Sequence, residues 1–231
     1  MKPTKTVLIT GATRGIGLAL ARLYAARGWK VIGAARDPSN AQQLSELPLH
    51  ALVALDVADE AAIRSAAEQL AGETIDLLIN NAGILVRTDM AATTKSDFMR
   101  TLEVNAVGPL LVTRAFLPQL KRAVAARGAA AVVQISSLSG SIEQTAACGS
   151  YSYHASKAAL NMLNASLAVD LAPDGIAAFT LHPGYVATDM NGFRGVISTE
   201  TSADGLASVI DRLTLADTGV FMDHNGDVLP W

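Results

Sequence analysis

A glycine-rich turn joins the first strand-forming segment of the chain to the first helix-forming one. Its residues are Thr10-Gly-Ala-Thr-Arg-Gly-Ile-Gly17. Gly11 lets the chain turn tightly after the strand, Gly15 leaves room for a pyrophosphate near the backbone, and Gly17 permits close packing of helix on strand. Because the first amides of a helix attract anions, the arrangement predicts a dinucleotide-binding turn. The spacing is Gly-x-x-x-Gly-x-Gly rather than the commoner Gly-x-Gly-x-x-Gly, and a turn that binds no ligand is the alternative.

Short apolar runs alternate with longer amphipathic segments along the chain, a pattern typical of βαβ units and a parallel sheet. We expect strands at 6–10, 30–35, 51–55, 75–80, 130–136, 176–181 and 219–222. We expect helices at 16–27, 59–70, 95–126, 151–171 and 201–213, the third of them broken or kinked by Pro109 and Pro118. The predicted fold is one doubly wound, Rossmann-type α/β domain over 1–231, with about seven parallel strands and helices on both faces.

The composition of the 231 residues excludes several classes of protein. Half of the residues are hydrophobic, and the net charge of −3 argues against nucleic-acid binding. No segment has the length and apolarity of a signal peptide or a membrane span. Cys148 is the single cysteine and the four histidines are scattered, so we expect no disulfide and no metal site. We interpret Cys148 as a packing residue, and we expect a cytoplasmic protein without a membrane partner.

Tyr153 and Lys157 are four residues apart in a helical pattern, which places a phenol and an ammonium on one face of the helix. Tyr151 would lie on another face. A phenol titrates near pH 10, and an ammonium about 4 Å away at an effective dielectric near 20 could lower that pKa by roughly three units. The pair therefore predicts a general acid, and an ordinary surface pair is the alternative.

Six motifs in this order resemble the short-chain dehydrogenase/reductase family, and the resemblance covers essentially the whole chain. They are Thr10–Gly17, Asn80-Asn-Ala-Gly83, Asn105 in Glu-Val-Asn-Ala-Val-Gly-Pro109, Ile135-Ser-Ser137, Tyr153-x-x-x-Lys157 and Pro183-Gly-Tyr-Val-Ala-Thr188. The resemblance implies a nicotinamide-dependent oxidoreductase that acts on CH–OH or C=O groups.

The resemblance also implies catalytic roles. Tyr153 would give a proton to the developing alkoxide, and Lys157 would lower the phenol pKa and bind the nicotinamide ribose. Ser137 would polarise the substrate carbonyl, with Ser136 as the alternative for this role. Asn105 would hold a water molecule that links Lys157 to solvent.

The cofactor contacts implied by the family come from the ends of successive strands. Asp56 would accept a hydrogen bond from the adenine amino group, and Thr188 with the backbone near Val186 would hold the carboxamide. For the asparagines of 80–83, a structural role is as plausible as direct contact. The full set is Gly11, Thr13, Arg14, Gly15, Ile16, Gly17, Arg36, Asp56, Val57, Asn81, Ala82, Gly83, Tyr153, Lys157, Pro183, Gly184, Val186 and Thr188.

The end of the second predicted strand favours NADPH (NADP) over NADH. Ala35 stands where an NAD-preferring enzyme carries an acidic residue. Arg36 follows it and Arg14 lies in the glycine turn, so two guanidiniums could flank a 2′-phosphate. The alternatives are solvated arginines, and Asp37 as an acceptor for a ribose hydroxyl.

The segments 150–157 and 219–231 resemble the subgroup that contains the sniffer carbonyl reductase and the bacterial C-factor signalling protein. This resemblance implies reduction of an aldehyde or ketone. The alternatives are a 3-oxoacyl-type reductase and a dinucleotide-binding signalling or redox-sensing protein with incidental turnover. By family analogy, the helices within 95–126 and 151–171 would form the interface of a homodimer or homotetramer.

Overall fold

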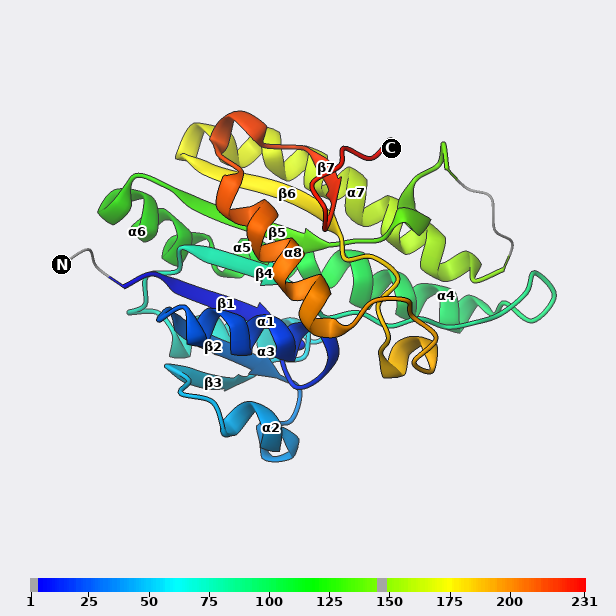
Figure 1. Cartoon of the computed structure of the whole chain (residues 1–231), viewed down its shortest axis with the longest axis horizontal. Helices are drawn as coiled ribbons and strands as arrows, with labels where there is room; N and C mark the ends of the chain where they lie inside the picture. Colours follow the sequence, from blue (N-terminus) through cyan, green and yellow to red (C-terminus); the bar gives the residue numbers. More distant parts are fainter. Residues whose placement is uncertain (1–3, 145–148) are drawn as a thin grey trace.

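A computed structural model describes residues 4–144 and 149–231, and its centre is a seven-stranded sheet with the order β3-β2-β1-β4-β5-β6-β7 (Figure 1). The strands are β1 Thr6–Thr10, β2 Lys30–Ala35, β3 Ala51–Ala54, β4 Leu77–Asn80, β5 Ala130–Ile135, β6 Ile176–His182 and β7 Phe221–Asp223. Each strand runs parallel to its neighbours. The strand order reverses between β1 and β4, and ligands of such sheets bind beyond the carboxyl ends of the strands at this point.

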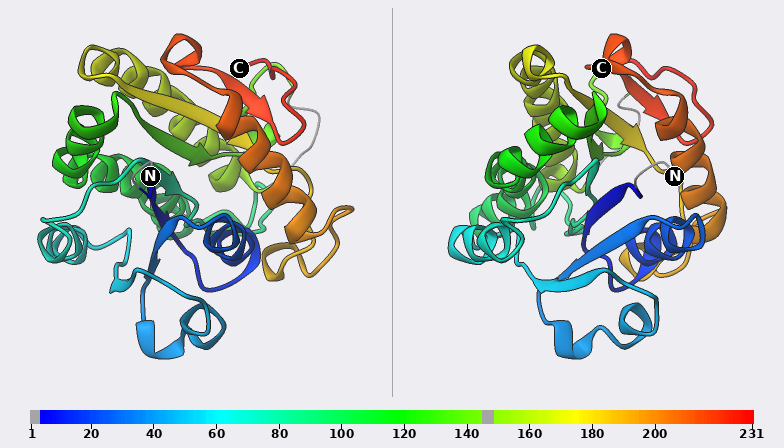
Figure 2. Two further views of the ribbon diagram at one scale, coloured as in Figure 1. Left: turned by 60° about the vertical axis from the view of Figure 1, so that its left-hand side comes forward. Right: turned by 90° about the vertical axis from the view of Figure 1, so that its left-hand side faces the viewer.

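Helices cover both faces of the sheet, as the two turned views show (Figure 2). They are α1 Gly15–Ala26, α2 Gln42–Ser45, α3 Glu60–Gln69, α4 Lys95–Leu102, α5 Gly108–Ala115, α6 Leu117–Arg127, α7 Tyr151–Leu171 and α8 Thr199–Arg212. The helices α1 and α8 pack on one face, where Ile9 and Leu206 belong to the same apolar core. Leu8, Ile63 and Phe116 belong to the core on the other face, with α3, α5 and α6.

The residues of β1 explain why this strand lies at the centre of the sheet. All five are buried, and Leu8 pairs with Ile32 of β2 on one side and Leu78 of β4 on the other. A strand covered on both faces needs a continuous apolar run rather than an alternating pattern. The predicted doubly wound α/β fold with seven parallel strands is confirmed.

The long helical segment predicted at 95–126 is three helices. A π-helical turn, Glu103–Val107, separates α4 from α5, and Phe116 separates α5 from α6. Pro109 and Pro118 each occupy one of the first two positions of the helix that follows a break, where a missing N–H costs no helical hydrogen bond. The expected interruption is therefore present in two forms: the backbone stays helical through the π turn before Pro109, whereas Pro118 begins a new helix after Phe116.

Some elements differ from the predictions, and β7, for example, lies at Phe221–Asp223 rather than at 219–222. The short helix α2 was not predicted. The strand β4 begins at Leu77, two residues later than expected, and the amide of Ile75 bonds to Gln119. Within 4–144 and 149–231 no helix combines the length and apolarity needed to cross a membrane. The same residues contain no cluster of three or more metal-ligating side chains. Cys148 lies outside the described residues.

Candidate active site

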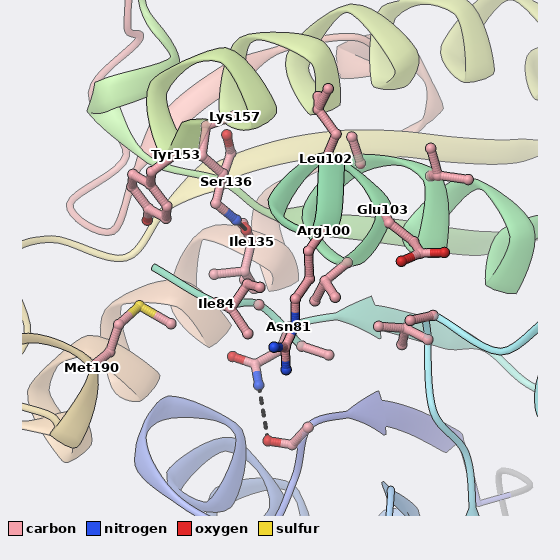
Figure 3. Close-up of a pocket in the computed structure, with 18 of the residues that line it drawn as sticks. Asn81, Ile84, Arg100, Leu102, Glu103, Ile135, Ser136, Tyr153, Lys157 and Met190 are labelled. Carbon is pink, nitrogen blue, oxygen red and sulfur yellow. Dashed lines mark hydrogen bonds between the residues drawn. The ribbon is translucent and has the colours of Figure 1, made fainter. Parts of the chain in front are cut away.

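A cleft of about 1130 Å³ opens beyond the carboxyl ends of the central strands. Tyr153 and Lys157 project into it from α7, Ile84 follows β4, and Met190 lies on the opposite wall (Figure 3). Most of the predicted cofactor residues line it: Gly11, Thr13, Arg14, Gly15, Ile16, Arg36, Asp56, Val57, Asn81, Ala82, Gly83, Tyr153, Lys157, Pro183 and Thr188. Gly17, Gly184 and Val186, also predicted, are not among its lining residues.

The glycine turn is held by the residues that follow β4. The Asn81 side chain donates to the carbonyls of Thr10 and Gly11 at 3.0 and 3.1 Å, and one bond of Asn81 is dashed in Figure 3. In return, the Thr10 hydroxyl accepts from the amides of Asn81 and Ala82. A Cβ at Gly17 would collide with the Gly11 carbonyl and the Asn81 amide. Asn81 therefore has the structural role that the sequence left open.

The start of α1 is suited to an anion. Among the described residues, none caps its first turn with a side chain, and Gly15-Ile-Gly contains no acidic residue. Uncapped amides and the positive end of the helix dipole both favour a phosphate. A Cβ on Gly15, whose φ is +55°, would meet the Thr188 methyl at 3.4 Å. The segment after β6 thus lies against the turn, and the positive φ is the reason that glycine is favoured at this position.

Arg14 and Asp189 connect the same two segments by an ion pair. Their nearest nitrogen and oxygen are 3.1 Å apart, and both side chains are exposed. An exposed pair contributes about 0–1 kcal/mol, so it can open when a stronger partner for Arg14 is present. Asp189 was not predicted as a site residue, and its position next to Thr188 was the signal available.

Tyr153 and Lys157 lie on one face of α7 as predicted. Lys157 Nζ is 5.8 Å from the centre of the Tyr153 ring and donates to the Ile135 carbonyl at 2.9 Å. Burial lowers the pKa of Lys157 to about 8. Burial also raises the pKa of Tyr153, and the side chain of Ser137 and the charge of Arg87 act in the opposite direction.

The expectation of a lowered Tyr153 pKa is therefore corrected, because its net shift is upward. Taking a phenol out of water disfavours its charged form, and this effect outweighs the others at Tyr153. Lys157 itself loses hydration, and its ammonium is directed to Ile135 rather than to the phenol oxygen. The Tyr153 hydroxyl consequently keeps its proton through neutral pH.

The two serines at the end of β5 have different partners. Ser136 is buried, and its hydroxyl donates to the Asn161 side chain at 2.6 Å. Ser137 accepts from the Ser139 amide at 3.1 Å, and its side chain is the one that interacts with Tyr153. This arrangement favours Ser137 over Ser136 as the partner of a substrate carbonyl.

Asn105 lies in the π-helical turn and is fully buried. Its side chain accepts from the Ile84 amide and donates to the Ile84 carbonyl, both at 2.8 Å, and also donates to the Ser156 hydroxyl at 3.0 Å. A Cβ on Gly83 would lie 3.3 Å from Asn105 Oδ1 and 3.8 Å from Lys157 Nζ. Asn105 therefore fixes the segment after β4 beside Lys157, and π turns often occur at functional sites.

The adenosine end of the cleft contains Asp56, whose carboxylate accepts from the Ala58 amide at 3.0 Å. Arg36 is exposed at the rim. Asp37 is engaged locally, because its carboxylate accepts from the Ser39 amide and hydroxyl and from the Asn40 side chain. These bonds lower the pKa of Asp37 and leave it poorly placed as a ribose acceptor.

The sequence analysis missed several supporting residues. Ser156 and Asn161 bind Asn105 and Ser136, and both lie on the buried side of α7 with Lys157. A run of polar residues at helical spacing on a buried face was the signal that could have found them. Arg87 and Met190 had no comparable signal, because both lie in segments without periodicity.

Comparisons with known proteins agree with this geometry. A family model described as short chain dehydrogenase matches residues 5–195. The C-signal protein of Myxococcus xanthus is 38% identical over 170 residues, which cover 73% of this chain and 100% of that protein. Two solved structures are also similar: the NADPH-bound carbonyl reductase from chicken fatty liver (TM-score 0.91, 36% identity, 99% of both chains) and the carbonyl reductase Sniffer of D. melanogaster (TM-score 0.92, 31% identity, 99% of this chain and 100% of that one). The chain belongs to the short-chain dehydrogenase/reductase family and is an NAD(P)-dependent oxidoreductase.

Proposed function

We propose that this protein is an NADPH-dependent carbonyl reductase that converts an aldehyde or ketone to an alcohol. The observation that carries the proposal is that Tyr153 and Lys157 line a cleft that begins at an uncapped helix N-terminus, with the Ser137 side chain against Tyr153. The similar structures from chicken and D. melanogaster are both carbonyl reductases, which supports the same chemistry here.

The residues along the cleft fit a dinucleotide. The uncapped amides at the start of α1 would hold the pyrophosphate, Asp56 and Val57 would contact the adenine, and Lys157 would bind the nicotinamide ribose. Thr188 lies against the glycine turn, where it would contact the nicotinamide end. When bound, the reduced nicotinamide supplies a hydride to the carbonyl carbon.

Tyr153 would supply the proton that completes the reduction. Its raised pKa keeps the hydroxyl protonated at neutral pH, so a proton is available for the carbonyl oxygen as negative charge develops there. Ser137 would donate a second hydrogen bond to the same oxygen and so orient the carbonyl. Lys157 is charged below pH 8 and would stabilise the phenolate that remains after proton transfer.

NADPH is the proposed reductant because Asp37, the acidic residue near the ribose end, already accepts hydrogen bonds from its own turn. Asp37 caps the turn that follows β2, whereas Arg36 is exposed beside the cleft. Arg14 would turn from Asp189 to the 2′-phosphate. Michaelis constants for NADPH and NADH with one aldehyde test this preference, and a strong preference for NADH would refute it.

The activity is tested by following NADPH oxidation with aldehydes, ketones, quinones and 3-oxo esters. Reduction of aldehydes or ketones that is lost in Tyr153→Phe supports the proposal. Preference for 3-oxo esters would favour a 3-oxoacyl-type reductase instead. A panel without turnover, together with tight NADPH binding, would favour a dinucleotide-binding signalling protein, a candidate that the 38% identity to C-signal supports.

We also propose a homodimer or homotetramer with an interface that includes α4 and α7, as the family resemblance implies. Met99 on α4 and Met162 on α7 are 56% and 66% exposed, and both border the same end of the cleft. Covering these apolar side chains would favour association. Light scattering of the parent and of Met162→Lys tests the interface; a parent that is monomeric at micromolar concentration would contradict the proposal.

A further inference from the structure

The segment after β4 runs from the cofactor cleft to the first turn of α7. Ile84 is fixed at one end by its two hydrogen bonds to Asn105. Thr88 is fixed at the other end, because its carbonyl accepts from the Ser150 amide at 2.7 Å. Ser150 in turn accepts from the amide of Tyr153, one helical turn further on. The segment between Ile84 and Thr88 therefore passes beside the proposed proton donor.

Arg87 lies in this segment, and its side chain is exposed. Within residues 4–144 and 149–231 its guanidinium makes no hydrogen bond and no ion pair. The nearby carboxylate of Asp89 instead accepts from the Ala92 amide at 2.8 Å. The charge of Arg87 nevertheless reaches the reaction site, because it opposes the rise in the Tyr153 pKa. Within the described residues, a cation without a counter-ion thus lies close enough to Tyr153 to act on it electrostatically.

The backbone next to Arg87 is held by hydrogen bonds, which limits the backbone entropy that this segment would lose when Arg87 binds a ligand. The Thr88 and Thr93 hydroxyls are 2.9 Å apart, and Thr93 donates to the Asp89 carbonyl at 2.6 Å. A guanidinium presents a planar set of donors that matches a carboxylate in a bidentate pair. A residue at this position is therefore suited to a carboxylate carried by the substrate.

We propose that Arg87 is a specificity-determining residue that binds a carboxylate on the substrate while the substrate carbonyl lies at Tyr153. This inference rests on the proposed carbonyl reduction and narrows its substrate class to carbonyl compounds with a carboxylate. Lys157 cannot take this role, because it is buried and bonded to Ile135. Arg87 is exposed, so a carboxylate could pair with it from the solvent side of the segment after β4.

Two matched aldehydes test the proposal: 4-formylbenzoate and its neutral methyl ester. We expect Arg87→Gln to lower kcat/KM for 4-formylbenzoate by about tenfold or more, mainly through KM, which corresponds to about 1.4 kcal/mol. The kcat/KM of Arg87→Gln for the ester should stay close to the parent's kcat/KM for the ester. Arg87→Lys should keep part of the preference for the carboxylate. Arg64→Gln removes an exposed charge on α3 and serves as the control for net charge.

The ratio of the kcat/KM values for the two aldehydes separates carboxylate binding by Arg87 from an effect on the Tyr153 pKa. A change in that pKa would alter both kcat/KM values alike. Equal losses on both, or no loss on either, would overturn the role of Arg87. If the parent reduces the ester without favouring the carboxylate, this inference fails and the proposed function stands. If the parent reduces neither aldehyde and no other aldehyde or ketone of the panel, the proposed function fails. Calorimetric titration of 4-formylbenzoate into the NADPH-loaded parent and Arg87→Gln then decides whether Arg87 binds the carboxylate, and equal affinities would refute it.

Discussion

Lys157 Nζ lies over the Tyr153 ring, 5.8 Å from its centre, and donates its hydrogen bond to the Ile135 carbonyl. The hydrogen bond of the ammonium is therefore directed to the backbone rather than to the Tyr153 hydroxyl oxygen. Burial raises the pKa of the phenol and lowers that of Lys157 to about 8. The pair combines a protonated phenol with a cation that can stabilise the phenolate formed after proton transfer.

Replacement of Tyr153 by Phe should remove the proton donor and keep the ring against Lys157. We expect kcat for aldehyde reduction to fall roughly 10²- to 10⁴-fold, the usual contribution of general acid catalysis. NADPH binding, followed by nicotinamide fluorescence, should stay near that of the parent because the cleft keeps its shape. Activity within about tenfold of the parent would show that another group gives the proton.

Replacement of Lys157 by Met should stabilise the protein at pH 7. Below pH 8 the folded and unfolded chains both carry the proton, and the buried ammonium costs roughly 3 kcal/mol, of which the bond to Ile135 returns about 1. Between pH 8 and 10.5 the folded chain releases this proton while the unfolded chain keeps it, so the parent gains stability as the pH rises. Urea unfolding should show that the variant exceeds the parent in unfolding free energy by more at pH 7 than at pH 9.5. A variant less stable than the parent at pH 7 would contradict a destabilising, buried ammonium at Lys157.

How far the sequence predicted this molecule depends on whether a feature is local. The bounds of β1, β2 and α7 agree with the predictions, because apolar runs and helical periodicity are read within a few turns. The shared face of Tyr153 and Lys157 follows from helix geometry alone. Their pKa shifts depend on burial, which is created by distant segments, and the local argument gave the wrong direction for Tyr153.

Features set by contacts between distant segments were missed. The π turn around Asn105 is stabilised by bonds to Ile84, 21 residues away. Arg87 comes near Tyr153 because Thr88 bonds to Ser150, and neither segment shows a pattern that predicts this meeting. The ion pair of Arg14 with Asp189 joins residues 175 positions apart.

Gly17→Ala should damage the dinucleotide turn. The new methyl group would collide with the Gly11 carbonyl and the Asn81 side chain, so β1 and α1 would have to separate. We expect a loss of about 1–3 kcal/mol in unfolding free energy and weaker NADPH binding. Gly72→Ala is the control, because its Cβ meets no atom within 4 Å. Normal NADPH affinity in Gly17→Ala would show that the turn still binds the dinucleotide when β1 and α1 move apart.

Arg36→Leu should weaken NADPH selectively. A charge-assisted bond to the 2′-phosphate contributes about 1.5–3 kcal/mol, which is roughly a ten- to hundredfold change in the dissociation constant. The dissociation constant for NADH should stay unchanged, because NADH lacks this phosphate. Fluorescence titrations with both dinucleotides measure the ratio directly. An equal effect on the two would show that Arg36 does not contact the phosphate.

His182, at the end of β6, should make the protein sensitive to acid. Its Nδ1 and that of His224 are buried and lack hydrogen-bond partners in the described part of the chain. Burial and the neighbouring His224 lower the pKa of His182 to about 4, and the charge of Asp223 opposes them. Between pH 6.5 and 4 the unfolded chain binds a proton that the folded chain does not, so stability falls as the pH falls through this window.

The His182 contribution amounts to about 3 kcal/mol over the window. His182→Asn should therefore lose less unfolding free energy than the parent between pH 6.5 and pH 4, measured with urea at several pH values. His50→Asn replaces an imidazole at the start of β3, paired with Glu73, and controls for the loss of a histidine elsewhere. Parallel pH profiles for the parent and His182→Asn would mean that His182 is protonated in the folded protein and that water or His224 accepts its hydrogen bond.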